Sequence, residues 1–230
     1  MLAIAGIATP ESASTQGAGT TPARAGSPTP IAPYTMRDVP LGITLEEFHT
    51  RTIPSDTGQY DLDVNCTSDG AMPRDPLSQI EPRDQADGIA TCEWWGREKR
   101  TDNLPSTYQI IWIDLGEGKG QPAFDFVSDG STVRLFRIRF YASSDYSPAI
   151  RRGLTDRYGA PSVTTGKVRT GAGIEFDADT LTWNNGASSI VFESPCRRID
   201  RYCLTYRHSA LYKVYDAILA KRAAAAAERF

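Results

Sequence analysis

Few residues in this chain could carry out chemistry, and they are widely spaced. The 230 residues include two histidines, His49 and His208, and neither lies near a Gly-x-Ser-x-Gly turn of the kind that presents a nucleophilic serine. A nucleophile, a base and an orienting group therefore cannot be assembled from neighbouring residues. Carboxylates that meet only in the folded chain stay open as an alternative, because catalytic residues can be far apart in sequence. We predict no catalytic residue and favour binding over catalysis.

Two short motifs resemble ion or phosphate sites but lack required positions. Residues 61–65 (Asp-Leu-Asp-Val-Asn) begin like a calcium loop, yet Cys66 and Met72 stand where that loop needs glycine and glutamate. The alternation of residues instead places these acids on the solvent side of a strand. Residues 116–120 hold Lys119 between glycines, but a phosphate loop needs serine or threonine after the lysine and then a helix. We expect neither a metal ion nor a cofactor.

The four cysteines fall into two pairs that are close in sequence, Cys66 with Cys92 and Cys196 with Cys203. No Cys-x-x-Cys spacing occurs, which argues against a zinc site or a thioredoxin-type redox motif. An even number of cysteines in this arrangement favours two local disulfides and an oxidising compartment. Four cysteines allow three pairings, and four free thiols in a cytosolic protein are the other interpretation.

Arginine and aromatic residues give the strongest indication of binding. One interpretation of the arginines is ordinary solvated charge. The other is an anionic or protein partner, because Arg137 and Arg139 share a strand face with Tyr141. The adjacent Trp94 and Trp95 point to opposite faces of a strand, and we expect Trp95 to be exposed as a contact residue. The predicted binding residues are Trp95, Arg137, Arg139, Tyr141 and Arg151.

The first forty residues differ from the rest of the chain. They contain six of the fifteen prolines and a single aromatic residue, so they can bury too little apolar surface to fold. We interpret residues 1–40 as a signal-like remnant followed by a disordered Pro/Ala/Thr-rich arm. The small-x-small pattern Gly6-Ile7-Ala8 resembles a signal-peptide cleavage site, although a basic region before it is missing. Together with the cysteines, this start predicts a periplasmic or secreted protein.

Charge and hydropathy exclude two classes of partner. The mean hydropathy is -0.37, and no apolar run approaches the ~20 residues of a membrane-spanning helix. The net charge of -3 argues against nucleic-acid binding, which usually needs a strongly basic domain. We therefore expect a protein partner, no membrane span and no nucleic acid. The oligomeric state is not indicated.

The elements that must position these residues lie within residues 41–230. Thr44 and Glu47 form a capping box at the start of a short helix. Ser147 and Pro148 begin a second helix, and residues 211–227 form a third. The segments between the helices alternate apolar and polar residues and are joined by tight turns, which require antiparallel pairing.

We therefore predict an α+β fold, an antiparallel sheet with helices packed on one face. Residues 41–230 form a single α+β domain, or two fused helix-plus-meander subdomains, 41–142 and 143–230, that share the sheet. Within residues 133–141, the alternation places Phe136, Ile138 and Phe140 on the core side.

Two joints of the chain resemble a known type of module. Gly42-Ile43-Thr44 opens the first helix and Gly159-Ala160-Pro161 follows the second. These joints resemble those of small bacterial envelope modules such as the beta-lactamase inhibitory protein and the outer-membrane assembly lipoprotein superfamily. Each helix has only one of the two joints, and no lipobox cysteine lies near the N-terminus, so lipid anchoring is not implied.

The resemblance implies a module that binds other proteins without catalysis. We therefore expect an exported, non-catalytic protein-interaction module of a bacterial cell envelope. The alternatives are a small hydrolase whose carboxylate site assembles only in the fold, and a small-ligand carrier in which the strands of residues 106–141 enclose an apolar pocket.

Overall fold

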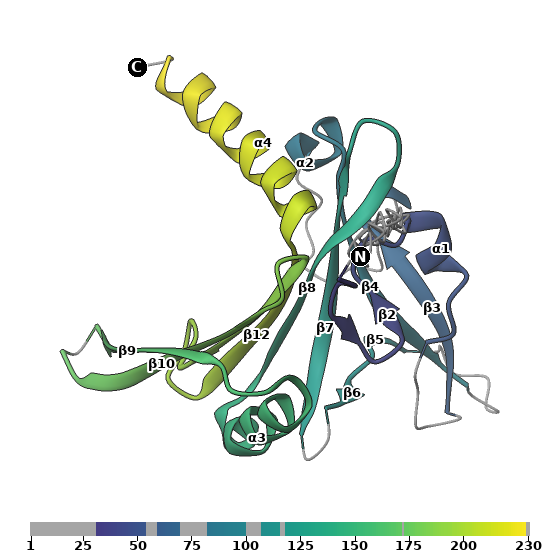
Figure 1. Ribbon diagram of the computed structural model, residues 1–230. Coiled ribbons are helices and arrows are strands. Elements are labelled where there is room, and N and C mark those ends of the chain that lie inside the picture. Colours follow the sequence, from purple (N-terminus) through teal and green to yellow (C-terminus); the bar gives the residue numbers. More distant parts are fainter. Residues whose placement is uncertain are drawn as a thin grey trace, which may run out of the picture. The chain divides into compact units, whose positions relative to one another are not determined.

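The computed structural model describes residues 31–53, 59–69, 82–99, 107–115, 118–171 and 173–228. It is an α+β structure built mainly of antiparallel strands (Figure 1). The predicted signal-like start and most of the predicted arm lie outside these residues. Within the described ranges, no helix is both long and apolar enough to cross a membrane.

One open sheet extends through both of the subdomains that the sequence allowed. Along its main path the strands are β3 (Tyr60–Cys66), β4 (Ile89–Glu98), β7 (Lys119–Ser128), β8 (Val133–Ser143), β12 (Arg201–His208), β11 (Ser188–Ser194), β10 (Glu175–Asn184) and β9 (Ser162–Arg169), in that spatial order. Every neighbouring pair is antiparallel, as the predicted fold class requires. Because β12 pairs with β8, the chain returns from its last strand to the middle of the sheet.

The smaller elements extend the sheet or flank it. The short strands β5 (Tyr108–Ile110) and β6 (Ile113–Asp114) pair with β4 and β7 respectively. β1 (Thr35–Met36) and β2 (Val39–Pro40) form a separate hairpin. The remaining elements are α1 (Leu45–His49), η1 (Thr67–Asp69), α2 (Pro82–Ala86), η2 (Ser144–Tyr146), α3 (Ser147–Tyr158) and α4 (Ser209–Ala227).

The main core lies on one face of the sheet, which we call the core face and define by Phe124 and Phe126 of β7 and Ile138 of β8. The predicted capping box of α1 is confirmed: Glu47 N donates to Thr44 Oγ1 at 3.1 Å and Thr44 N donates to Glu47 Oε2 at 2.8 Å. This start directs Phe48 into the core, where its ring centroid lies 4.6 Å from that of Phe124. The helix α3 packs on the same face through Ile150 and Leu154.

The prediction that all helices pack on one face is wrong for α4. Phe126 and Val127 are adjacent in β7 and therefore point to opposite faces. Phe126 belongs to the main core, whereas Val127 belongs to a second cluster with Leu211 of α4. In that cluster the Tyr215 ring stacks on Phe136 at 4.7 Å. The helix α4 therefore covers the face opposite α1 and α3.

A β-bulge is the reason that Phe136 faces α4. Asp125 of β7 opposes Arg137 of β8, but the next residue, Phe126, opposes Leu135. Phe136 is left without a partner in the ladder, and the alternation of side chains is shifted by one residue at that point. Leu135 therefore joins Ile138 on the core face, and the predicted placement of Phe136 there is wrong.

Both disulfides form as the cysteine spacing predicts. Cys66–Cys92 joins directly opposed residues of β3 and β4, and Cys196–Cys203 joins the loop after β11 to β12. All four cysteines are described, and none is free. Two disulfides indicate an oxidising environment, because cytosolic thiols are kept reduced.

We predict that the two disulfides contribute unequally to stability. The cysteines of the first are 26 residues apart and those of the second are 7 apart, so the first restricts the unfolded chain more. The double variant Cys66→Ala/Cys92→Ala should lose about 3 kcal/mol of unfolding free energy, about 1 kcal/mol more than Cys196→Ala/Cys203→Ala. Urea denaturation of both variants measures the difference. Equal losses, or the reverse order, would contradict this assignment.

Candidate functional site

The structure places four of the five predicted binding residues on one face of the sheet. We call this the arginine face and define it by Arg137, Arg139 and Tyr141 of β8 with Asp125 and Gln121 of β7. Trp95 lies on the same face, because Glu93, two residues before it in β4, opposes Ala123, which in turn opposes Arg139. The fifth predicted residue, Arg151, lies on the other side of the sheet.

Arg151 is held by α3 above the core face. Its Nη1 donates to Asp179 Oδ2 of β10 at 3.1 Å, and Asp179 alternates with the core residue Leu181. The sequence places Arg151 shortly after the strand that carries the other arginines, but α3 crosses to the opposite face. Arg151 therefore cannot share a binding surface with Arg137 and Arg139.

Trp95 is buried, which contradicts the expectation that it is exposed. Trp94 and Trp95 do point to opposite faces, as predicted, but Trp95 is only 5% exposed. Ile110 of β5 is paired directly opposite it, in a position that the sequence did not reveal. The Trp95 side chain lines a cavity of about 290 Å³ together with Asp63, Arg97 and Tyr108. Trp95 supports this cavity and cannot serve as an exposed contact residue.

Asp125 organises the arginine face. Its carboxylate is almost fully buried and accepts from Arg137 Nε at 2.7 Å and from Arg139 Nε at 2.6 Å, both at Oδ2. Its other oxygen, Oδ1, accepts from Arg139 Nη2 and from Thr91 Oγ1, each at 2.8 Å. Three neighbouring strands, β4, β7 and β8, thus meet at one carboxylate. Both arginines are fixed within the protein rather than freely solvated.

The charge of this cluster is set by the balance between burial and ion pairing. Burial opposes ionisation of Asp125, but the Arg139 and Arg137 guanidiniums outweigh it and hold the pKa of Asp125 below its usual value. Burial likewise opposes the charge of Arg137, and Asp125 outweighs it and raises the pKa of Arg137. Asp125 is therefore a fixed anion at neutral pH, with no proton to donate in acid catalysis.

Three arginines of this face also lie over aromatic rings. The Arg137 guanidinium carbon is 5.2 Å from the Phe136 ring centroid and 5.0 Å from that of Tyr215. Arg207, which opposes Arg137 on β12, lies 4.9 Å from the Tyr212 ring, and Arg201 lies 5.6 Å from the Tyr141 ring. Like charges directly opposed across strands repel, and the rings and Asp125 offset that repulsion.

A hollow of about 320 Å³ opens on the arginine face beside these contacts. It is lined by Arg139, Tyr141, Gln121, Glu193, Arg197 and the Cys196–Cys203 disulfide, among others. Arg197 also lines a neighbouring hollow of about 740 Å³ that contains the exposed side chains of Val168 and Ile199. The two hollows are therefore adjacent on the surface.

Arg197 is a site residue that sequence reasoning missed. Its φ of 59° lies in the left-handed region, which is uncommon for a residue other than glycine. Its side chain is exposed, and no described carboxylate lies within 4.0 Å of its guanidinium. The sequence feature that could have identified Arg197 is its position between Cys196 and a second arginine, in a turn that the disulfide closes.

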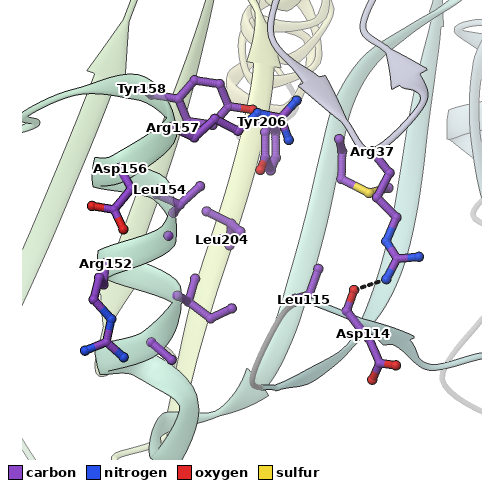
Figure 2. Close-up of a pocket in the computed structure, with 14 residues that line it drawn as sticks. Arg37, Asp114, Leu115, Arg152, Leu154, Asp156, Arg157, Tyr158, Leu204 and Tyr206 are labelled. Atoms are coloured by element: carbon purple, nitrogen blue, oxygen red, sulfur yellow. Dashed lines mark hydrogen bonds between the residues drawn. The ribbon is translucent and has the colours of Figure 1, made fainter.

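Another cavity, of about 460 Å³, lies on the core-face side between α3 and the β1–β2 hairpin (Figure 2), and we call it the α3 groove. Arg152, Leu154 and Asp156 of α3 lie along one wall, Arg37 and Asp114 lie along the other, and Leu204 lies between the walls (Figure 2). Arg37 donates from Nη2 to the Asp114 carbonyl oxygen, and Tyr158 donates to the Thr35 carbonyl oxygen at 3.1 Å. Nothing in the sequence pattern indicated this α3 groove.

Neither histidine belongs to a catalytic arrangement among the described residues. His208 is the N-cap of α4: its Nδ1 accepts from Leu211 N at 3.4 Å, and burial lowers its pKa. His49 Nε2 lies 4.0 Å from Asp69 Oδ2 and near Cys66, but Cys66 is in a disulfide and cannot ligate a metal as a thiolate. Asp61 is exposed on β3, as predicted, and pairs with Arg97 and Lys99.

We predict that Asp125→Asn is strongly destabilising, because it leaves two partly buried guanidiniums without their anion. The expected loss of unfolding free energy is about 3 kcal/mol. Asp179→Asn is the matched control, since Asp179 also pairs with an arginine but is partly exposed, and it should cost less than about 1 kcal/mol. Urea denaturation at neutral pH measures both. Similar losses in the two variants would refute the central role of Asp125.

The lowered pKa of Asp125 also predicts how stability depends on pH. The ionised cluster stabilises the folded state fully above the unfolded-state pKa of about 3.9 and loses this effect as the pH falls through the lower folded-state value. The stability difference between the wild type and Asp125→Asn should therefore shrink below about pH 4. Denaturation curves from pH 7 to pH 2 test this. A difference that stays constant would show that Asp125 carries no special charge stabilisation.

Comparison with known proteins gives no match: no family model, no curated protein and no solved structure is significantly similar to this chain. The functional interpretation therefore depends on the geometry of the site and on the sequence itself.

Proposed function

We propose that this protein is an exported, non-catalytic interaction module of a bacterial cell envelope and that it binds a protein partner through the arginine face. Two disulfides support export to an oxidising compartment such as the periplasm or the extracellular space. The signal-like residues 1–8 and the resemblance to envelope modules support the same location.

The observation that carries the proposal is the hollow between Tyr141 and Arg197 on a face that α4 leaves partly open. Arginine and tyrosine are the residue types most enriched at energetically important interface positions. Asp125 holds Arg139 in place before any partner arrives, which reduces the conformational entropy lost on binding. The Arg201 guanidinium lies over the Tyr141 ring and restricts its position through a cation–π contact.

The chemistry of this surface favours a partner segment with both acidic and apolar side chains. Arg197 offers an exposed guanidinium, whose planar donors suit a carboxylate. Val168 and Ile199 present apolar surface in the adjoining hollow. A segment that crosses both hollows would place an acid at Arg197 and an apolar residue beyond it.

Of the alternatives, the small-ligand carrier keeps one observation in its favour. The described strands within residues 106–141 belong to an open sheet, but the α3 groove of about 460 Å³ has a size that suits a small molecule. The hydrolase is less favoured, because the fully buried carboxylate of Asp125 binds arginines, and the two glutamates that line the hollow, Glu93 and Glu193, share it with Arg139 and Arg197.

Site-specific photo-crosslinking in a bacterium that produces the chain tests the proposal. A photoreactive amino acid at Tyr141 should give a discrete protein adduct, and the same group at Arg152, on the opposite side of the sheet, should not. Adding Arg197→Glu should lower the yield of the Tyr141 adduct about tenfold, equivalent to about 1.4 kcal/mol of binding free energy.

A matched charge reversal controls for net charge. Arg157→Glu changes the charge equally, but Arg157 lies in α3 beside the groove on the other side. It should leave the Tyr141 adduct unchanged. The proposal fails if no adduct forms at Tyr141, or if Arg157→Glu and Arg197→Glu reduce it equally.

A further inference from the structure

The strand β9 ends the sheet with an unpaired edge. It pairs with β10 along its whole length, and no strand among the described residues pairs with its other side. All eight of its residues, Ser162 to Arg169, are exposed, so no described element covers either of its faces. In Figure 1, β9 and β10 form the end of the sheet that extends outward beyond α3. The edge is about 27 Å long at ~3.4 Å per residue.

An edge of this kind is a template for another strand. Every second residue of β9 directs its backbone N–H and C=O away from β10, and these groups can form a new ladder. β9 contains no proline, and its charged residues, Lys167 and Arg169, both lie in its second half on the same face as Leu181, so they protect that half and leave Ser162 to Thr165 open to pairing. Its exposed valines, Val163 and Val168, add apolar surface at the edge.

The charges of the hairpin favour a second copy of β9 over a strand of a different, acidic protein. The two cations of β9 already have an acidic partner: Glu175 of β10 lies 3.6 Å from Lys167 Nζ and 2.8 Å from Arg169 Nη2. The edge therefore does not need an acidic strand to balance it. Both cations lie in the second half of β9, and the first half, Ser162 to Thr165, is uncharged.

We propose that β9 is a homodimerisation edge that pairs antiparallel with β9 of a second copy of this chain. Antiparallel pairing sets the cationic half of each strand against the neutral half of the other. Parallel pairing would place lysine near lysine and arginine near arginine, which is unfavourable. The two copies are related by a two-fold axis, as is usual for homodimers.

The two-fold axis restricts the register. When two antiparallel strands of a homodimer lie side by side, the two-fold axis is perpendicular to the sheet. Each residue then faces a residue of the second copy whose side chain points to the same face of the sheet. The residue on the axis faces the same residue of the second copy. With Thr165 on the axis, Thr164 faces Gly166 of the second copy and Val163 faces its Lys167. A Thr–Thr pair at the centre is favourable, whereas an axis at Gly166 would leave two glycines opposed. An axis at Thr164 also gives a Thr–Thr pair, but Lys167 and Val168 would then face Pro161 and Ala160, which lie outside β9. The proposed register therefore centres on Thr165.

This dimer would form one continuous sheet from both copies. Because the axis is perpendicular to the sheet, the arginine faces of the two copies lie on the same side of it. The homodimer itself does not depend on the proposed function of that face, and its test does not use a partner.

Light scattering coupled to size-exclusion chromatography of the full chain, from micromolar to near-millimolar concentration, measures the assembly. The expected mass at high concentration is twice the 25.2 kDa of one chain. Thr165→Glu should return the protein to a single-chain mass, because two like charges then face each other at the axis. Mixing Thr165→Glu with Thr165→Lys should restore the dimer, because opposite charges meet there.

Thr164→Glu is the matched control, since it adds the same charge one residue away but faces Gly166 of the other copy, and it should keep the dimer. Thermal unfolding checks that each variant is folded: Thr165→Glu faces Asp179 of β10 in its own chain and should lose some stability, whereas Thr165→Lys should not. A single-chain mass for the wild type at all concentrations overturns the proposal. So does a wild-type dimer that Thr165→Glu leaves intact, or a Thr165→Glu and Thr165→Lys mixture that stays monomeric.

Discussion

Asp125 and the two guanidiniums that it binds set the arrangement of the middle of the sheet. Arg137 and Arg139 point to one face of β8, and β12 adds Arg207 directly opposite Arg137. Three cations so close together would repel one another in partly buried surroundings. The Asp125 carboxylate and the Tyr212 and Tyr215 rings of α4 offset this repulsion. The docking of α4 and the charge of the arginine face therefore depend on the same small group of contacts.

The bulge at Phe136 makes this arrangement compatible with a packed core. Without the extra residue, Phe136 would point to the core face with Ile138, and Tyr215 would have no Phe136 ring to stack on. With it, β8 contributes Leu135 and Ile138 to one side and Phe136 and Arg137 to the other. A single strand can thus support two hydrophobic clusters, one under α1 and α3 and one under α4. The helix α4 is held further along by Arg222, which binds Asp84 and Asp87 near α2.

The open parts of the structure differ in the chemistry that they offer. The arginine face has guanidiniums fixed by Asp125 and aromatic rings, which suits recognition of a protein surface. The α3 groove combines an apolar lining with charged walls, and burial raises the pKa of Tyr206 within it, so this phenol stays neutral and acts as a hydrogen-bonding group. The β9 edge offers backbone groups rather than side chains. The α3 groove lies on elements separate from the other two features, whereas the β9 edge shares Val168 with the hollow that adjoins the arginine face.

The sequence alone predicted those features of the structure that depend on local interactions. The capping box of α1, the Cys196–Cys203 disulfide and the β10–β11 hairpin depend on residues close together in the chain, and all three are as predicted. Long-range contacts decided the rest. Trp95 is buried opposite Ile110, fifteen residues further along the chain, and α3 places Arg151 on the opposite face. The exposure of all eight residues of β9 also depends on where the sheet ends in space. The bulge is also invisible in the sequence, because the alternation of β8 alone fits either register, and only packing against β7 and α4 selects one.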